Sequence, residues 1–136
     1  MFRALDVSTS GLVAQRARLD AISSNIANLS TTRNERGELE PYTPRYATFQ
    51  TDAQVNTSGG GVGVHVASIE HAQVEPRIKY EPGHPDADEN GYVAYPNIDM
   101  TMEFVDAMEA TRAYEANIGV MGISKDLAQR MLQILA

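Results

Sequence analysis

The C-terminal part of the chain, residues 98–135, constrains the fold most, because it lacks proline and repeats its apolar residues every seven positions. The first set of positions holds Met100, Ala107, Tyr114, Met121, Ala128 and Leu135, and the second holds Phe104, Thr111, Ile118, Lys125 and Leu132. This repeat predicts one continuous helix about 55 Å long at a rise of ~1.5 Å per residue. So long a helix cannot fold back on a small core, and it must pack on the N-terminal helix, on a neighbouring subunit, or on both.

The start of this helix has its own signals. Asn97 follows Pro96 directly and is the predicted N-cap, while Asp99 and Glu103 suit the positive end of the helix dipole.

Residues 5–29 predict a second helix with a narrow apolar stripe. Its seam positions hold Leu5, Leu12, Leu19 and Ile26, with Ser8, Gln15, Ile22 and Leu29 between them. Gly11 weakens the first turns, because glycine costs ~1 kcal/mol relative to alanine inside a helix. Asn25 and Asn28 fit two interpretations equally well: buried residues that set the register, or a polar face and frayed exit.

The middle of the chain predicts short strands and turns. Val62, Val64 and Val66 alternate with other residues, as do Ile78 and Tyr80, and residues 57–61 form a turn or link. We therefore expect a mainly α fold with a small β element, in which long N- and C-terminal helices form a coiled-coil layer around an acidic, loop-rich middle. The fold would have three parts, residues 1–33, 34–97 and 98–136, which together would form one structural unit.

Composition and charge exclude several classes of protein. The chain of 136 residues has no cysteine, which excludes disulfides and thiolate sites, and its net charge of −7 argues against duplex nucleic-acid binding. The charge is +2 over residues 1–33, −7 over 34–99 and −2 over 100–136, so the two ends should attract each other. Residues 1–6 lack the apolar block of a cleavable secretory signal, and no apolar run is long enough to span a bilayer.

The acidic segment 86–91 is the feature most like a ligand site. It has oxygen-bearing side chains at Asp86, Asp88 and Asn90 and then Gly91, as at the opening of a calcium loop. Asn97 stands where a bidentate Glu is needed, so a structural turn is favoured over calcium binding. His65, His71 and His84 lack zinc-site spacing, and no nucleophile or phosphate-loop motif is present. We expect no enzyme activity and no cofactor.

Three segments resemble bacterial flagellar axial proteins. The N-terminal signature of that family resembles Ser10-Gly11-Leu12, Ala14-Gln15-Arg16 and Ser24-Asn25-Ile26-Ala27-Asn28, followed by Thr31-Thr32. A region of its proximal rod proteins is similar to His84-Pro85-Asp86-Ala87-Asp88, with Gly91-Tyr92-Val93 and Pro96-Asn97. Their C-terminal helix motif resembles Arg112-Ala113-Tyr114-Glu115-Ala116-Asn117, with Lys125 downstream.

The resemblance implies a structural subunit of the flagellar basal-body rod. Such proteins leave the cytoplasm uncleaved through the flagellar type III export apparatus and polymerise in the periplasm into a shaft that transmits torque from motor to hook and filament. The implied partners are further copies, the other proximal rod proteins, the rod–ring adaptor FliE, the distal rod proteins and the export apparatus. Neither nucleic acid nor membrane insertion is implied.

The expected assembly residues follow from the seams and the matched motifs. In the helices they are Leu5, Ser10, Gly11, Leu12, Gln15, Leu19, Ile22, Asn25, Ile26, Asn28, Thr31, Phe104, Thr111, Arg112, Tyr114, Glu115, Asn117, Ile118, Met121, Leu132 and Leu135. In the loop they are His84, Pro85, Asp86, Asp88, Gly91, Tyr92, Pro96 and Asn97. The alternative function is a small acidic cytoplasmic type III export chaperone or adaptor, whose size, acidity and amphipathic C-terminal helix would fit equally.

Overall fold

The structure, a computed structural model, describes residues 2–135. Residues 1 and 136, the outermost residues of the predicted terminal segments, lie outside the described range. The elements in chain order are helix α1 (Phe2–Ala27), strands β1 (Arg45–Asn56), β2 (Val62–His71), β3 (Arg77–Tyr80) and β4 (Tyr92–Tyr95), and helix α2 (Met100–Leu135). The predicted fold class, two long terminal helices around a small β middle, is confirmed.

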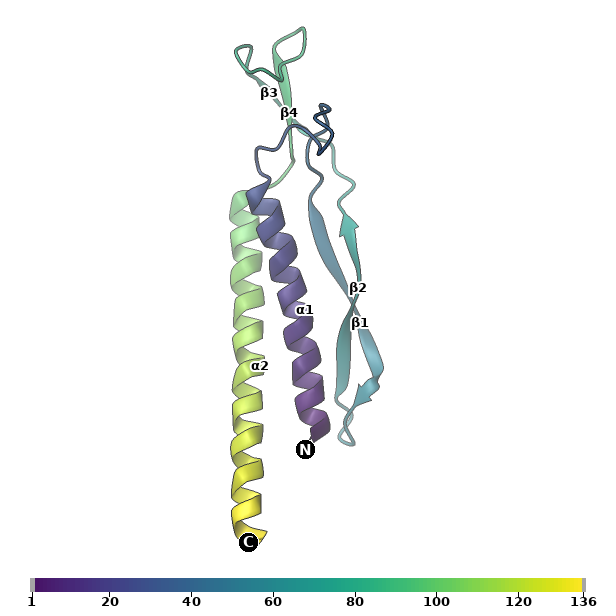
Figure 1. Cartoon of the computed structure of the whole chain (residues 1–136), viewed down its shortest axis with the longest axis vertical. Helices are drawn as coiled ribbons and strands as arrows, with labels where there is room; N and C mark the ends of the chain where they lie inside the picture. Colours follow the sequence, from purple (N-terminus) through teal and green to yellow (C-terminus); the bar gives the residue numbers. More distant parts are fainter. Residues whose placement is uncertain (1, 136) are drawn as a thin grey trace.

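α1 lies between the other two layers of an elongated molecule (Figure 1). It packs against α2 on one side and against the β1–β2 hairpin on the other. The β3–β4 hairpin sits at the end of the molecule where α1 ends and α2 begins, and the opposite end of α2 extends past the start of α1. Neither described helix is long and apolar enough to cross a membrane.

Small side chains let α1 and α2 approach closely. Ala14 of α1 is 2% exposed and Ala110 of α2 is fully buried. A Cβ placed on Gly11 would lie only 2.9 Å from Asn117 Nδ2, so Gly11 sits where α1 has no room for a side chain. The helix runs unbroken through Gly11, because this close packing offsets the low helix propensity that the sequence indicated.

α2 begins two residues later than expected and has a different cap. The predicted N-cap, Asn97, is wrong: Asp99 Oδ1 accepts hydrogen bonds from the backbone N–H groups of Thr101 (2.8 Å) and Met102 (3.3 Å). Asn97 stays exposed, while Ile98 is buried between it and the cap. Ile98 is buried outside the helix, which starts at Met100.

β1 and β2 form a long antiparallel hairpin whose first strand the sequence did not reveal. The strand predicted around Val62, Val64 and Val66 is confirmed, and the predicted turn closes with Gly60 N–H donating to Thr57 O at 3.0 Å. β1 carries Thr, Gln and Asp among its apolar residues, so its alternation is weak. Its burial comes from α1, which covers one face of the hairpin.

β3 and β4 form a second, separate hairpin. Ile78 pairs with Ala94 and Tyr80 with Tyr92, and the two tyrosine rings meet edge to face at 5.3 Å between centroids. The strand predicted at Ile78 and Tyr80 is confirmed, but β4 lies within the segment that was expected to be a loop. Val93, only 1% exposed, is the apolar anchor that makes this segment a strand.

The close contact between the helices predicts a strong size limit at Ala110. Ala110→Leu should lower the free energy of unfolding by ~1–3 kcal/mol, because an added isobutyl group would force the helices apart. Ala116→Leu, at an exposed position of the same helix, is the matched control and should change stability by less than about 0.5 kcal/mol. Thermal denaturation of both variants measures this, and equal losses would contradict the observed packing.

Candidate assembly interface

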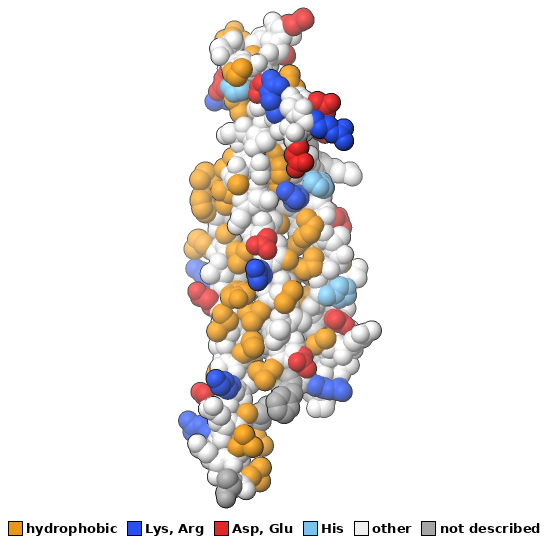
Figure 2. All heavy atoms as spheres, viewed as in Figure 1, with side chains coloured by type: hydrophobic (Ala, Val, Ile, Leu, Met, Phe, Trp, Pro, Cys, Tyr) orange, Lys and Arg blue, Asp and Glu red, His pale blue; other side chains and the backbone are white. Residues whose placement is uncertain are grey.

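α2 presents two contrasting faces. The face toward α1 carries residues that are buried or half-buried: Glu103, Asp106, Ala107, Ala110, Ala113, Tyr114, Asn117, Met121, Ser124 and Ala128. The rest of the helix exposes large apolar side chains: Met102, Phe104, Val105, Met108, Ile118, Val120, Ile123, Leu127, Met131, Leu132, Ile134 and Leu135. In the space-filling view, apolar side chains gather in a band along the helices (Figure 2). Within the subunit, α2 therefore buries mainly its small and polar residues.

This arrangement corrects one of the two predicted seams. The positions represented by Ala107, Tyr114 and Met121 do face α1. The second set, expected at Phe104, Thr111, Ile118, Lys125 and Leu132, is shifted by one residue for its first four members, to Glu103, Ala110, Asn117 and Ser124, and Leu132 stays exposed. Large side chains such as Phe104 and Ile118 would hold the helices apart if they faced α1. Smaller residues such as Ala110 and Ser124 therefore pack against α1, and the large apolar side chains stay exposed.

The other expected residues of α2 and α1 are distributed as follows. Arg112, Glu115 and Leu135 are exposed; Leu5, Leu12, Leu19, Gln15 and Ile26 are half-buried, and Ile22 is buried. Gln15 Oε1 is buried and has no hydrogen-bond partner among the described residues.

The Ser10-Gly11 pair faces two different layers. Ser10 Oγ donates to Val7 O (2.7 Å) and accepts from the backbone N–H of Val64 in β2 (3.0 Å). A Cβ on Gly63 would lie 2.7 Å from Val55 Cβ of β1 and 3.1 Å from that same oxygen, so the hairpin has little room for a side chain at this contact. One residue further on, Gly11 contacts α2. The motif thus places α1 between hairpin and helix.

Asn25 joins three segments of the chain. Its Oδ1 accepts from the backbone N–H of Arg45 (2.8 Å) and the hydroxyl of Tyr42 (3.1 Å). Its Nδ2 donates to Arg45 O (2.8 Å) and to Glu103 Oε1 (3.1 Å). Asn25 is 3% exposed, so the buried, register-setting interpretation holds for it. Sequence reasoning missed Tyr42 and Arg45, which carry no motif, and assigned Glu103 only to the start of the helix.

Asn28 fits the other interpretation and ends α1. Its Nδ2 donates to Ser24 O (2.8 Å), a carbonyl of the last turn that also accepts from the backbone N–H of Asn28 (3.2 Å), and its Oδ1 accepts from the Thr31 hydroxyl (3.0 Å). The two asparagines therefore have different roles three residues apart.

Opposite charges meet between the helices, as the uneven charge distribution predicted. Arg18 of α1 lies 3.2 Å from Glu109 Oε2 and 3.6 Å from Asp106 Oδ1 of α2. Close by, burial raises the pKa of the Glu103 carboxyl, an effect that the Asn25 hydrogen bond opposes and the charge of Asp106 reinforces. The ionised form of Glu103 thus costs stability, whereas the Arg18 pairs add a small amount.

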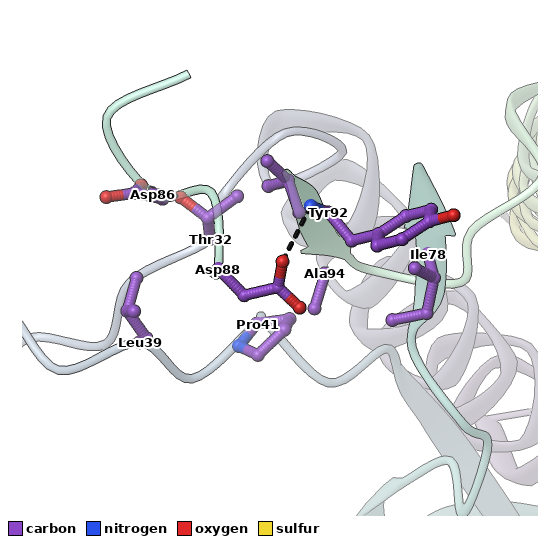
Figure 3. A pocket seen from close by; sticks show the side chains of 9 residues that line it. Thr32, Leu39, Pro41, Ile78, Asp86, Asp88, Tyr92 and Ala94 are labelled. Carbon is purple, nitrogen blue, oxygen red and sulfur yellow. Dashed lines mark hydrogen bonds between the residues drawn. The ribbon is translucent and has the colours of Figure 1, made fainter. Parts of the chain in front are cut away.

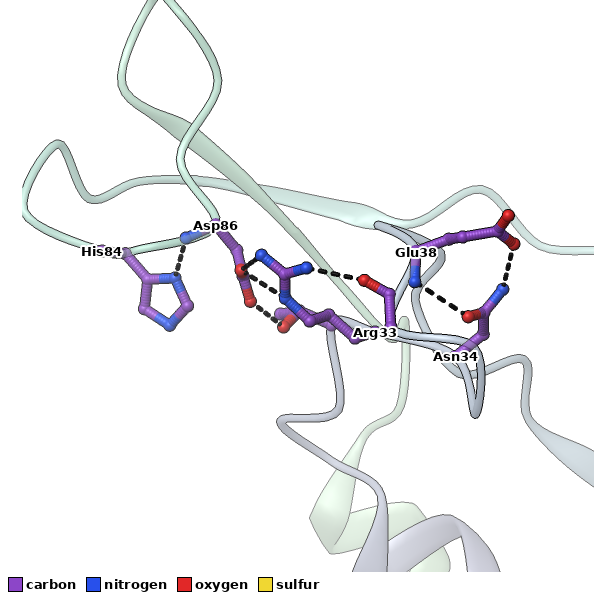
Figure 4. Close-up of polar contacts among 7 residues, drawn as sticks. Arg33, Asn34, Glu38, His84 and Asp86 are labelled. Atoms are coloured by element: carbon purple, nitrogen blue, oxygen red, sulfur yellow. Dashed lines mark hydrogen bonds and ion pairs between the residues drawn. The ribbon is translucent and has the colours of Figure 1, made fainter.

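The loop motif holds the β3–β4 hairpin on the segment that follows α1 (Figure 4). Asp86 accepts from the Thr32 hydroxyl (2.6 Å) and from Arg33 Nε (2.7 Å), and it forms an ion pair with the same guanidinium. His84 Nδ1 accepts from the backbone N–H of Asp86 (3.1 Å). Hydrogen bonds from Thr32 and then Arg33 lower the pKa of Asp86, whose side chain is only 8% exposed.

The rest of the motif forms the structural turn that the sequence favoured. Asp88 Oδ1 accepts from the backbone N–H groups of Asn90 (2.9 Å) and Tyr92 (2.8 Å), and Gly91 adopts φ +81°. Gly91 and Pro96 are buried, whereas Pro85, Asp88, Tyr92 and Asn97 are exposed. Over residues 2–135, no three His, Asp or Glu side chains are grouped so that they could hold a metal ion.

Beside this turn is an apolar cavity of about 370 Å³ (Figure 3). Leu39, Pro41, Ile78 and Ala94 line it, and Asp86 and Asp88 lie at its edge. The Asp86 carboxylate accepts hydrogen bonds from Thr32 and Arg33 of the segment after α1, and Asp88 accepts them within the turn, so these residues join two segments of the chain.

Comparison with known proteins agrees with this architecture. The model of flagella basal body rod proteins matches residues 5–33, and the model of the flagellar basal body rod FlgEFG protein C-terminal region matches residues 89–134. The flagellar basal-body rod protein FlgC of Bacillus subtilis is 39% identical over 98% of this chain and 97% of its own length. The FlgC proteins of Borreliella burgdorferi (99% and 97% covered) and Salmonella typhimurium (95% and 93%) are each 40% identical.

The chain belongs to the FlgC family of flagellar basal-body rod proteins. It is a structural rod subunit and not an enzyme. The export-chaperone alternative has no support in these relatives, all of which are rod proteins over nearly their whole length.

The Asn25 contacts predict a large effect of a small truncation. Asn25→Ala should lower the free energy of unfolding by ~1–3 kcal/mol, because the Arg45 backbone groups lose their partner in a buried site. Asn56→Ala, which removes exposed contacts to Arg3 and Ala53, should cost less than about 0.5 kcal/mol. Urea denaturation compares them, and a neutral Asn25→Ala would contradict a structural role for this residue.

The Asp86 contacts predict a pH-dependent hold on the β3–β4 hairpin. Since the folded pKa of Asp86 is lowered, its stabilising effect is complete above the unfolded value of ~3.9 and is lost as the pH falls through the folded value. Asp86→Asn should therefore speed amide exchange in β3 and β4 at pH 6 relative to the parent, and the difference should shrink as the pH falls through the lowered folded pKa of Asp86. Hydrogen exchange measures this; a difference that persists in acid would mean that packing, not charge, is lost.

Proposed function

We propose that this chain polymerises through α1 and α2 in the periplasm into the part of the rod that carries torque from motor to hook and filament. The supporting observation is the exposed apolar surface of α2, which α1 covers on one face only. An apolar surface of this extent is typical of a protein interface. Contacts between different faces of identical subunits build open helical arrays, as a tube requires.

Location and partners are parts of the same proposal. The chain would reach the periplasm through the flagellar type III export apparatus without cleavage and would contact the other proximal rod proteins, FliE and the distal rod proteins. The expected assembly residues that remain exposed, among them Phe104, Ile118 and Leu132, would supply these contacts, whereas Ile22 and Asn25 are buried within the subunit. Residues 34–99 carry a net charge of −7, which suits a surface on the outside of the rod in contact with water.

Electron microscopy of basal bodies from a strain that lacks only this gene tests the function directly. We expect the membrane ring and export apparatus to remain and the rod to be missing, with restoration by the intact gene. A complete rod and filament without the gene would exclude an essential rod subunit.

A charge on the apolar surface of α2 should block assembly without unfolding the subunit. Leu132 is 67% exposed, so Leu132→Asp should leave the thermal midpoint unchanged while rod formation is lost, because an unpaired carboxylate buried in an interface is costly. Gln133→Asp, with the same charge at the next position, is the control and should assemble. Normal rods built from Leu132→Asp would show that this surface is not buried in the rod.

A further inference from the structure

The outer face of α2 has a counterpart on the other side of the same molecule. This face carries Val105 (53% exposed) and Met108 (56%), with the exposed Arg112 one turn further on. On the other side, α1 and β2 enclose a groove of about 310 Å³. Ala17, Ala21 and Ser24 of α1 line it, Ile69 of β2 contributes a 45% exposed apolar side chain, and Asp20 and Arg45 are its charged residues.

The charges of the two surfaces are complementary. Asp20 and Arg112 are both exposed, and neither takes part in any of the ion pairs found among residues 2–135. Arg45 is occupied within the subunit, because its guanidinium lies 3.1 Å from the Tyr42 hydroxyl and 3.4 Å from Ser24 Oγ. Asp20 is therefore the charged residue of the groove that remains available to pair with a basic side chain of another molecule.

The two surfaces also lie at the same height along the molecule. Asn25 bonds to Glu103, and Gly11 faces Asn117, so each step down α1 matches one step along α2. Asp20 is thus level with Met108, and Arg112 is about 6 Å further along at ~1.5 Å per residue, within reach of an arginine side chain. A second copy placed alongside needs no large shift to bring the two surfaces together.

We propose that the groove between α1 and β2 receives the outer face of α2 from a second copy of this chain, with Arg112 of that copy paired with Asp20. This inference rests on the proposed function and specifies which surfaces meet around the rod. Val105 and Met108 would cover Ile69 and the small residues of the groove. Because the two surfaces differ, each copy can bind the next and the contact repeats without closing into a dimer.

Charge reversal tests the pairing in cells that carry the variant in place of the normal gene. Asp20→Arg and Arg112→Asp should each reduce the number of complete rods per cell roughly tenfold or more, because like charges would then face each other across the contact. The double variant should restore rods to near the parental number. Asp6→Arg, the same change two heptads away on α1, is the control and should assemble.

The outcomes separate this inference from the proposed function. Rescue by the double variant, with both single variants folded by thermal denaturation, supports the contact between copies. Normal assembly of the single variants, or failure of the double variant to restore rods, overturns it and indicates a different neighbour, while the deletion strain still reports whether the chain is a rod subunit. Complete rods in the deletion strain would overturn both.

Discussion

The hydrogen bonds of the Asn25 side chain meet at the point on which the rest of the structure depends. They join the last turns of α1 to the first residue of β1 and the first turn of α2. The site is buried, so water cannot replace a lost partner, and every alternative register of the helices would leave a polar group unpaired. Asn25 therefore sets the height of α2 against α1 and, with it, the levels of all surfaces that the subunit presents.

α1 is the central element because both of its sides are occupied. Ser10 binds the hairpin backbone while Gly11, one residue on, accepts the closest approach of α2. Small residues bring the helices together, and this choice has a consequence for assembly. The large apolar side chains of α2 have no place inside the subunit and are left on its surface, where a neighbouring molecule can bury them.

Two carboxylates show how environment separates chemically similar groups. Asp86 is held by a hydroxyl and a guanidinium, which favour its ionised form, and it fastens the β3–β4 hairpin to the chain after α1. Glu103 lies in the helix contact, where burial disfavours its charge. Acid thus weakens the contact at Asp86 and removes the cost of the buried charge at Glu103, so these two sites respond to pH with opposite sign.

The sequence by itself determined the two long helices, the turn and strand signals of the middle, and the family motifs, because periodicity, glycine and proline act locally. It also determined one seam of α2, but not the second, since apolar content cannot distinguish a contact within the subunit from one between subunits. Only the tertiary structure placed Glu103, Ala110 and Asn117 inward, made Asp99 the cap, and turned the weakly alternating residues of β1 into a strand. For the α2 seam and for β1 the deciding factor was an element distant in sequence, a close helix or a covering layer, and for the cap it was the burial of the neighbouring Ile98 in the tertiary structure.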